Sequence, residues 1–525
     1  MPAPTPLTAR PAFLPLVAAA VALILGSLAT SYYAAQDLTL SHYDAKAHLV
    51  VARRIFDSLT PGWRQIGAVW LPLPHVLNAL PVQVDAWYRT GLSGVVISML
   101  SFAAAAASLT WLVARLSGSV PAALATLAIF VYQPDLLYLQ ATPMTEPLLL
   151  GLTISGVAWL HHWTTGMVER YRARRPGDTR TRPPEPSAWP AGLLLALACL
   201  TRYEAWPITV AAGLVAWLTL WRQRVGFAQS LTLVWRIGVW PLGALILFLI
   251  LSKATVGAWL VTGGFYEPNN PAYREPAKAL VQVGWGLGRV GGWPVAWAAA
   301  AGAIVVLLQG LVRADRQAWW FVLALAGSAA LPYYAFVSGH PFRIRYMILL
   351  ITAAAACIGM VIALLPKAWR PAVLLVVLGV LAVERRPLGL TSPMVAEAQW
   401  DRANQRERRD VTACLMDAWR GEPILVSMGS LAHYMQETST SGLSIRHYIH
   451  EGIGELWYEA LKSPRRHAAF VLVEEKAEGG DQLFQMAQKD PAFLSGFTRT
   501  CEGGGVALYV RTPPTGDAPG PGLRP

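Results

Sequence analysis

The sequence predicts an all-α polytopic membrane domain followed by a small C-terminal α/β domain, and three observations support this fold class. Of the 525 residues, 54% are hydrophobic and only 14% are charged, whereas soluble proteins have about 25% charged residues. Long apolar stretches recur along residues 1–385, as expected because a charge at the bilayer centre costs at least ~2.5 kcal/mol. The chain also has 22 Trp residues, a side chain that gathers at membrane–water interfaces.

The apolar stretches predict about eleven transmembrane helices. They lie at about 13–34, 91–114, 119–133, 147–163, 189–201, 206–221, 237–252, 289–312, 318–337, 346–365 and 371–384. Several are shorter than the ~20 residues of a perpendicular crossing. A cleavable signal peptide is the alternative for the first stretch, but the stretch is long, Arg10 is a thin n-region, and many further stretches follow. We therefore expect a retained helix.

The loops that should lie on one side of the membrane are basic, which predicts the orientation. Their basic residues are Arg10, Arg115, Arg170, Arg172, Arg174, Arg175, Arg180, Arg182, Arg222, Arg224, Arg236, Arg313, Arg316, Lys367 and Arg370. By the positive-inside rule this side is cytoplasmic. A cell (inner) membrane protein with an extracytoplasmic C-terminal domain follows. The net charge of +12 is thus attributed to topology and anionic lipid, and no nucleic-acid partner is expected.

Residues 386–512 predict a soluble periplasmic α/β domain. Val395–Trp419 has helical spacing, while 423–427, 468–473 and 507–510 are typical of short strands. The tail 513–525 is rich in Pro and Gly and is expected to be disordered. Cys414 and Cys501 both lie in this domain, and in an oxidising compartment they are able to pair; the sequence leaves this open.

The loop 35–90, expected on the extracytoplasmic side, is the richest in polar residues. From Asp44 to Leu59 apolar residues recur at helical spacing, which predicts an amphipathic helix lying along the interface. Asp44 would lie at its N-terminus, where the helix dipole favours a carboxylate. Asp44 is therefore a candidate catalytic carboxylate, and a simple N-cap residue is the alternative.

Three turns between later apolar stretches carry charged residues on the same expected side. Glu146 follows the third stretch, Arg202-Tyr203-Glu204 lies between the fifth and sixth, and Arg343-Ile344-Arg345 precedes the tenth. Singly, Arg202 and Glu204 are explained by a structural ion pair, and the later arginines by lipid headgroups. Together with the loop 35–90, these turns predict a pocket for an anion beside one or two carboxylates.

Such a pocket suits the transfer of a sugar from a lipid phosphate. The departing phosphate is a weak base and needs only cations such as Arg to stabilise its charge. The attacking hydroxyl or amine needs a base, and one carboxylate contributes typically 10²–10⁴-fold. One acid and an arginine cluster at a membrane surface are therefore sufficient.

At these residues the sequence resembles the GT-C fold glycosyltransferases, specifically the family 39-like group of protein O-mannosyltransferases and aminoarabinose transferases. The resemblance rests on Asp44 early in the first outer loop, the helix ending in Arg53-Arg54, and Arg345-Tyr346 before a late span. It covers roughly residues 10–385 and implies that Asp44 acts on the acceptor. Many relatives have a second acid after this position, where this chain has Ala45; Glu146, or else Glu204, would supply that carboxylate.

The predicted site residues follow from the loops and the resemblance together. Asp44 and Glu146 are the catalytic candidates. The substrate-binding candidates are His42, His48, Arg53, Arg54, Arg202, Tyr203, Glu204, Lys253, Arg343 and Arg345. No cofactor is expected; a divalent metal held by Asp44, His48 and Glu146 stays open, although the chain shows no compact ligand spacing.

Two further segments have structural explanations. The glycines of 284–292 open an apolar stretch, which favours helix packing over a nucleotide-binding loop. Arg446–His450 is a candidate contact for the acceptor, with a plain surface strand as the alternative.

The expected function is a membrane glycosyltransferase that uses a polyprenyl-phosphate-linked donor and an extracytoplasmic protein, lipid or glycan as acceptor, with inversion at the anomeric carbon. The alternatives are a transporter or lipid flippase, and a non-catalytic membrane subunit whose soluble domain binds a partner. A transporter would have charges midway along its spans and an internal repeat; this chain has its charges at one face and no repeat at a fixed period. A subunit would tolerate replacement of the acids.

Overall fold

The computed structural model describes residues 13–173, 183–261, 269–384, 386–477 and 479–512. The chain forms two compact units. Unit 1 consists of Met1–Thr39, Ala68–Leu77 and Leu92–Ala398, and unit 2 consists of Leu40–Gly67, Asn78–Gly91 and Gln399–Pro525. Several features of the sequence prediction lie outside the described residues: Arg10, Arg174, Arg175, Arg180, Arg182, Arg385 and the tail 513–525.

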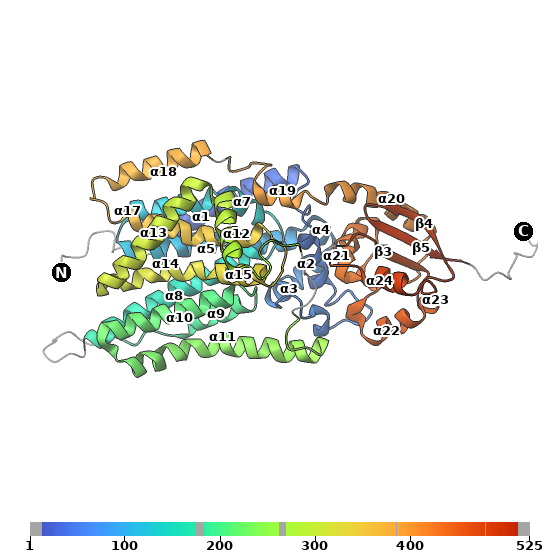
Figure 1. The fold of residues 1–525 in the computed structure, drawn as a ribbon, viewed down its shortest axis with the longest axis horizontal. Helices are drawn as coiled ribbons and strands as arrows, with labels where there is room; N and C mark the ends of the chain where they lie inside the picture. The colour runs from blue at the N-terminus through green and yellow to red at the C-terminus, as the bar shows by residue number, and fades with distance from the viewer. Residues whose placement is uncertain (1–12, 174–182, 262–268, 385, 478, 513–525) are drawn as a thin grey trace, which may run out of the picture. The chain divides into compact units, whose positions relative to one another are not determined.

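Unit 1 is helical (Figure 1). Its α-helices are α1 (Phe13–Ala35), α3 (Leu73–Asn78, ending at the border with unit 2), α5 (Leu92–Ser117), α6 (Val120–Val131), α7 (Pro134–Leu139), α8 (Glu146–Arg172), α9 (Trp189–Cys199), α10 (Ala205–Leu220), α11 (Phe227–Val256), α12 (Pro276–Gly291), α13 (Trp293–Val312), α14 (Trp320–Ala324), α15 (Ala330–Val337), α16 (Arg345–Ile348), α17 (Leu350–Ile362), α18 (Arg370–Glu384) and α19 (Pro393–Ala398). Short segments η4 (Trp221–Val225), η5 (Ala314–Trp319) and η6 (Leu325–Ala329) connect some of them.

Helices occupy all eleven stretches that the sequence predicts as spans. Six helical segments of the described chain are long and apolar enough to cross a membrane: Phe13–Ala35, Leu92–Ser117, Phe227–Val256, Trp293–Val312, Ala314–Val337 and Arg345–Ile362. Two shorter apolar helices are Val120–Val131 and Trp189–Cys199. The chain is therefore a multi-pass membrane protein, while the count of eleven crossings stays a prediction.

One expected span begins later than predicted. The stretch 289–312 is divided at Gly292, whose φ of 83° lies in the region that favours glycine. The residues before it belong to the separate helix α12. Two glycines of α12 serve helix packing, as predicted: a Cβ on Gly286 would come within 2.4 Å of Met347, and one on Gly288 within 2.7 Å of the Trp293 ring, whereas Gly284 has no neighbour within 4 Å.

Small residues let the helices of unit 1 approach closely, as is usual in membrane proteins. A Cβ on Gly151 of α8 would lie 2.8 Å from the carbonyl oxygen of Ser101 on α5. A Cβ on Gly359 of α17 would lie 2.9 Å from the carbonyl oxygen of Ala122 on α6. The Gly151 contact lies near the N-terminal end of α8, where Glu146 of the candidate site lies, whereas the Gly359 contact lies at the end of α17 far from Arg345.

Unit 2 is built on a five-stranded sheet of order β2-β1-β3-β5-β4. The strands are β1 (Ile424–Val426), β2 (Tyr448–Ile449), β3 (Phe470–Glu474), β4 (Phe497–Gly503) and β5 (Val506–Arg511). β1 pairs in parallel with β2 and β3, while β5 is antiparallel to both β3 and β4. The strands β1 and β3 are short apolar runs and are almost entirely buried, as expected for strands that are covered on both faces.

The remaining elements of unit 2 precede, connect or follow these strands, and in Figure 1 α20, α21 and α24 lie beside the sheet. They are α2 (Tyr43–Arg53), η2 (Trp63–Ile66), η3 (Pro81–Gln83), α4 (Asp85–Thr90), α20 (Arg402–Ala418), α21 (Met428–Glu437), η7 (Thr438–Ser441), η8 (Ile445–His447), η9 (Glu451–Ile453), α22 (Glu455–Lys462), α23 (Pro464–His467) and α24 (Gln482–Lys489). The three predicted strands and the small α/β class are thus confirmed. The predicted helix 395–419 is divided between α19 and α20, and 448–449 is a buried strand rather than a surface one.

The loop 35–90 contributes most of its residues to unit 2. Leu49, Val50 and Ala52 of α2 belong to the same buried cluster as Ile424 and Phe470 of the sheet. The helix predicted for Asp44–Leu59 ends earlier, at Arg53. Its apolar side chains are covered by protein rather than by the membrane interface that the sequence predicted. Residues separated by more than 370 positions in the sequence thus form one core, which buried apolar area stabilises.

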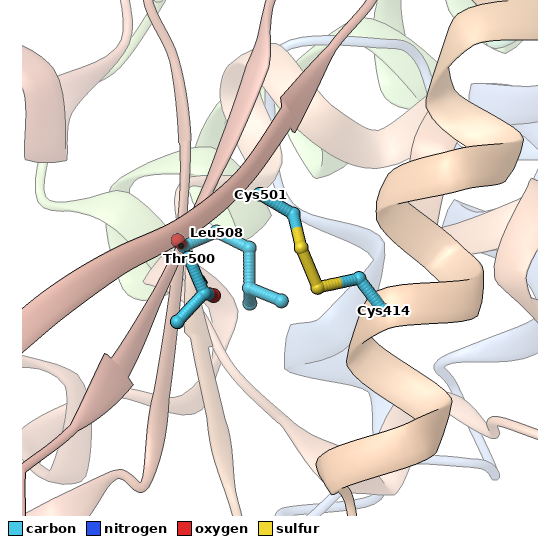
Figure 2. The surroundings of a disulfide bond; sticks show 4 residues. All are labelled: Cys414, Thr500, Cys501 and Leu508. Carbon is cyan, nitrogen blue, oxygen red and sulfur yellow. Dashed lines mark hydrogen bonds between the residues drawn. A yellow bond between two sulfur atoms is a disulfide. The ribbon is translucent and has the colours of Figure 1, made fainter.

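A disulfide joins Cys414 of α20 to Cys501 of β4, across 87 positions of sequence. Figure 2 shows the bond between helix and strand, beside Leu508. Thr500, next to Cys501, donates a hydrogen bond to the Leu508 carbonyl at 3.4 Å. The pairing that the sequence left open is therefore present and holds α20 against the edge of the sheet.

Candidate functional site

Glu146 is the first residue of α8, and its side chain is only 1% exposed. Pro147 follows it, in the first turn where a missing N–H costs no hydrogen bond. Ser98 of α5 donates a hydrogen bond to the Met144 carbonyl at 3.1 Å and so holds the segment before the helix. The N-terminal end of the helix dipole favours a carboxylate here.

Arg202 approaches Glu146 from the turn between α9 and α10. Its Nη1 lies 3.1 Å from Glu146 Oε1 and 3.0 Å from the Thr145 hydroxyl. Its Nη2 lies 2.9 Å from Glu204 Oε1. The backbone N–H of Leu73 donates to the Leu200 carbonyl at 3.0 Å and supports this turn. One guanidinium therefore joins two carboxylates from separate helix ends.

Arg345, the first residue of α16, is the second cation beside Glu146. Its Nε lies 4.0 Å from Glu146 Oε1, and its guanidinium lies 5.5 Å from the centre of the Tyr346 ring. The buried Glu397 accepts a hydrogen bond from the backbone N–H of Ile344 at 3.1 Å. Glu397 thus fixes the backbone directly before Arg345. Arg343 lies in the same turn and is half-buried.

Glu146, Arg202, Glu204 and Arg345 form what we call the α8 cluster. It contains two carboxylates and two guanidiniums, so its formal charge is zero. Both oxygens of Glu146 are buried without a hydrogen bond of good geometry among the described residues. A buried carboxylate normally has such partners, so Glu146 has unused capacity to accept hydrogen bonds. Sequence reasoning found all four members, although it missed Thr145 and Glu397.

Two other predicted site residues of unit 1, Tyr203 and Lys253, have hydrogen-bond partners within that unit. The Tyr203 hydroxyl donates to the Val69 carbonyl at 3.4 Å, and its ring packs on Trp206. Lys253 donates to the Gly257 carbonyl at 2.7 Å, at the C-terminal end of its own helix, where a cation is favoured. The contacts of Lys253 therefore favour a helix-end role.

Asp44 lies in the first turn of α2 and is almost fully buried. His42 is the N-cap, and its Nδ1 accepts a hydrogen bond from the Asp44 backbone N–H at 3.1 Å. The capping role is therefore filled by His42, and the carboxylate of Asp44 is not required for it. His48 lies one turn further along α2 and is also buried.

Arg53 and Arg54 have partners inside unit 2. Arg53 pairs with Asp57 at 3.0 Å and with Asp85 at 2.6 Å. Arg54 donates to the Met428 sulfur at 2.7 Å, and its burial lowers the pKa of its guanidinium to about 10, although Glu451 opposes this shift. These contacts favour a structural role for both arginines over contact with a phosphate.

Sequence reasoning missed a second group of charges, which holds α2 in unit 2. Lys46, 1% exposed, lies 2.6 Å from Glu437. Arg408, also 1% exposed, pairs with Glu437 at 2.7 Å and with Asp401 at 2.6 Å. We call these four residues the α2 network. Burial raises the pKa of Glu437, but Lys46 and Arg408 outweigh this and hold it below its usual value.

No sequence signal pointed to the α2 network. Lys46 and Glu437 are 391 positions apart, and Arg408 stands in a run of charges that looks like a solvated helix face. Among the residues that the structure describes, no three His, Cys, Asp or Glu side chains gather as a metal site would require.

Comparisons with known proteins give a structural likeness only. No family model matches the chain, and no curated protein matches it either. Two crystal structures of ArnT, an aminoarabinose transferase from Cupriavidus metallidurans, are similar to it. The structure bound to undecaprenyl phosphate has a TM-score of 0.53 at 11% identity, and the apo structure has 0.54 at 13%.

Each likeness covers 94% of this chain and 97% of the ArnT chain. At such low sequence identity, the likeness shows the fold alone, and the activity has to be argued from the site. The resemblance predicted from short motifs is thereby confirmed at the level of architecture. The chain has the GT-C glycosyltransferase fold.

Proposed function

We propose that this protein is an integral membrane glycosyltransferase that transfers a sugar from a polyprenyl-phosphate-linked donor to an extracytoplasmic acceptor, which is a protein, a lipid or a glycan. The observation that carries the proposal is the GT-C fold over 94% of the chain, shared with a transferase bound to undecaprenyl phosphate. The α8 cluster adds the chemistry, since it combines carboxylates and guanidiniums at helix ends.

The proposed reaction inverts the anomeric carbon. Asp44 takes the proton of the acceptor hydroxyl or amine, and the acceptor attacks the anomeric carbon. The bond between that carbon and the phosphate oxygen breaks, and its electron pair leaves with polyprenyl phosphate. Arginine side chains stabilise the phosphate as its charge grows.

The contacts in unit 1 suggest different roles for its arginines. Arg202 is already engaged by Glu146, Glu204 and Thr145. We propose Arg343 and Arg345 as phosphate ligands because they stand in one turn that brings Arg345 within 4.0 Å of Glu146, and Arg202 as the residue that holds the carboxylates in place. Glu146 would accept a hydrogen bond from the sugar or acceptor, because its buried oxygens have that capacity. Arg53 and Arg54 are not proposed as phosphate ligands, because both have partners inside unit 2.

We also propose eleven crossings, a cytoplasmic N-terminus and an extracytoplasmic unit 2. The disulfide between Cys414 and Cys501 supports this orientation, because disulfides persist in oxidising compartments. A thiol-reactive reagent that cannot cross membranes should label a Cys introduced at the exposed Asp410 in intact spheroplasts. Labelling only after lysis would contradict this orientation and place unit 2 on the cytoplasmic side.

The test of the function uses purified full-length protein and a panel of polyprenyl-phosphate sugars, with released polyprenyl phosphate measured by mass spectrometry. We expect release with at least one donor when acceptor-containing membranes are supplied. Asp44→Asn should lower the rate about 10²–10⁴-fold, while Asp410→Asn, an exposed acid of unit 2, should leave it unchanged. Normal turnover of Asp44→Asn would overturn the assignment of the base.

The proposal also requires Asp44 and Glu146 to act at one site. In a double variant, Asp44→Cys with Glu146→Cys, a short two-thiol crosslinker should join the two positions. The pair Glu146→Cys with Glu169→Cys is the control and should not be joined, because these positions lie about 34 Å apart along one helix. Absence of crosslinking in the first pair, with both thiols reactive, would contradict a shared site.

A further inference from the structure

A cavity in unit 1 is lined by none of the residues of the α8 cluster. It has a volume of about 550 Å³ and is lined by residues of α12, α13 and α18 and of the segment before α19. Two arginines, Arg289 and Arg386, and one acid, Glu384, belong to its lining. The hydroxyl-bearing Thr391 and Ser392 line it as well. The lining therefore has a net positive charge and hydrogen-bond donors.

The walls of the cavity are fixed by buried hydrogen bonds. Gln133 donates to the Val290 carbonyl at 3.1 Å and to Asp135 at 2.9 Å. Asp135 in turn accepts from the backbone N–H of Met394 at 2.8 Å. The elbow between α12 and α13 is set by Gly292, whose positive φ favours glycine. The cavity is thus part of the packed helix assembly rather than a gap between loose segments.

Apolar helix surfaces flank the cavity. Val383 at the end of α18 is 88% exposed, and Trp297 on the first turns of α13 is 69% exposed. Leu375 and Ile304, further along the same two helices, are also exposed. In a membrane protein such surfaces face lipid chains. A lipid with its chains along α13 and α18 would bring its headgroup to the cavity.

We propose that this cavity binds the phosphate-bearing headgroup of an anionic glycerophospholipid. Arg289 and Arg386 would contact the phosphate, because guanidinium groups match phosphate oxygens in geometry and charge. The hydroxyls of Thr391 and Ser392 would donate to the glycerol or phosphate oxygens. The proposal does not depend on the transferase activity, since none of these residues belongs to the α8 cluster.

The test is native mass spectrometry of delipidated, purified full-length protein titrated with phosphatidylglycerol or phosphatidylcholine. We expect phosphatidylglycerol to bind more tightly. The double variant Arg289→Gln/Arg386→Gln should weaken its binding about 25-fold, at about fivefold for each arginine. Thr391→Trp, which adds bulk to the cavity without changing charge, should also weaken it.

The matched control is Arg313→Gln/Arg316→Gln, which removes the same charge at the other end of α13. It should change binding about twofold or less, because neither of these arginines lines the cavity. Transferase turnover in detergent, measured in parallel, should be the same for all variants, which separates this inference from the proposed function.

Three results would overturn the inference. Equal binding of the two lipids, or an equal loss in the control variant, would show that the cavity does not select a phosphate headgroup. Displacement of the lipid by millimolar inorganic phosphate alone would assign the cavity to free phosphate. Tighter binding of undecaprenyl phosphate, lost in the Arg289→Gln/Arg386→Gln variant, would make the cavity part of the donor site.

Discussion

Two groups of buried charges, one in each unit, are built differently. In the α2 network, Lys46, Arg408, Glu437 and Asp401 are joined by hydrogen bonds of good geometry. In the α8 cluster, Glu146 has ion-pair contacts at 3.1 and 4.0 Å, yet neither of its oxygens has a well-formed hydrogen bond in the described chain.

The difference teaches how to separate structural from functional charges in this protein. A satisfied network holds its elements together, and breaking it leaves a buried charge without a partner. A buried carboxylate with unused accepting capacity gains partners only when a ligand arrives. Substitution in the α2 network should therefore cost stability, and substitution in the α8 cluster should cost activity.

The largest effect is expected for Glu146→Gln. The neutral amide keeps the shape but loses the charge that orients Arg202 and Arg345, so the rate of polyprenyl phosphate release should fall about 10²-fold. The melting temperature should fall by less than in a variant that breaks the α2 network, because Arg202 keeps its ion pair with Glu204. Glu169→Gln, at the exposed far end of the same helix, is the control. A large drop in melting temperature would place Glu146 with the structural charges.

Next, Arg408→Met should destabilise unit 2 by about 3–5 kcal/mol. The substitution leaves the carboxylate of Asp401 without its arginine, and Glu437 keeps only Lys46 as an ion-pair partner. Hydrogen exchange of β1 and β3 in the full-length protein measures the effect. Arg409→Met removes the exposed neighbouring charge and should change stability by no more than about 0.5 kcal/mol. Equal protection in the two variants would contradict a structural role for the network.

A slightly smaller loss, about 2–4 kcal/mol, is expected when the disulfide is removed by Cys414→Ser/Cys501→Ser. The bond constrains a segment of 87 positions, which lies wholly in unit 2. Cys199→Ser, a buried free cysteine of unit 1, should leave the exchange of β4 and β5 unchanged. Alkylation of Cys414 and Cys501 without prior reduction would show that they do not pair.

The smallest effect concerns pH. Burial, opposed by Arg408 and reinforced by Asp481, raises the pKa of Glu474 on β3 to about 8. The folded state therefore holds this proton where the unfolded chain has lost it, and stability falls as the pH rises from the ordinary Glu value towards 8. Glu474→Gln should flatten this fall in thermal unfolding between pH 5 and 8. If the pH dependence of the melting temperature were the same in Glu474→Gln and in the unsubstituted protein, Glu474 would not be its cause.

Part of the candidate site was predictable from the sequence. Glu146, Arg202, Glu204 and Arg345 stand at breaks between apolar stretches, and polar residues there are costly enough to signal a role. Arg53 and Arg54 looked equivalent to them, but a charge pattern does not tell whether a guanidinium has a partner. Asp57, Asp85 and Met428 supply those partners, from segments whose proximity no local pattern encodes.

The sequence by itself determined the helical membrane architecture, the position of the soluble α/β segment and the GT-C resemblance. These follow from local quantities: the length of apolar runs, the period of hydrophobic residues and the cost of charge in a bilayer. The tertiary structure decided that α2 belongs with the C-terminal sheet, that Cys414 pairs with Cys501, and that Lys46 is neutralised by a residue 391 positions away. Such contacts depend on how distant segments pack, and packing is decided by the shape of the whole core rather than by any one stretch of sequence.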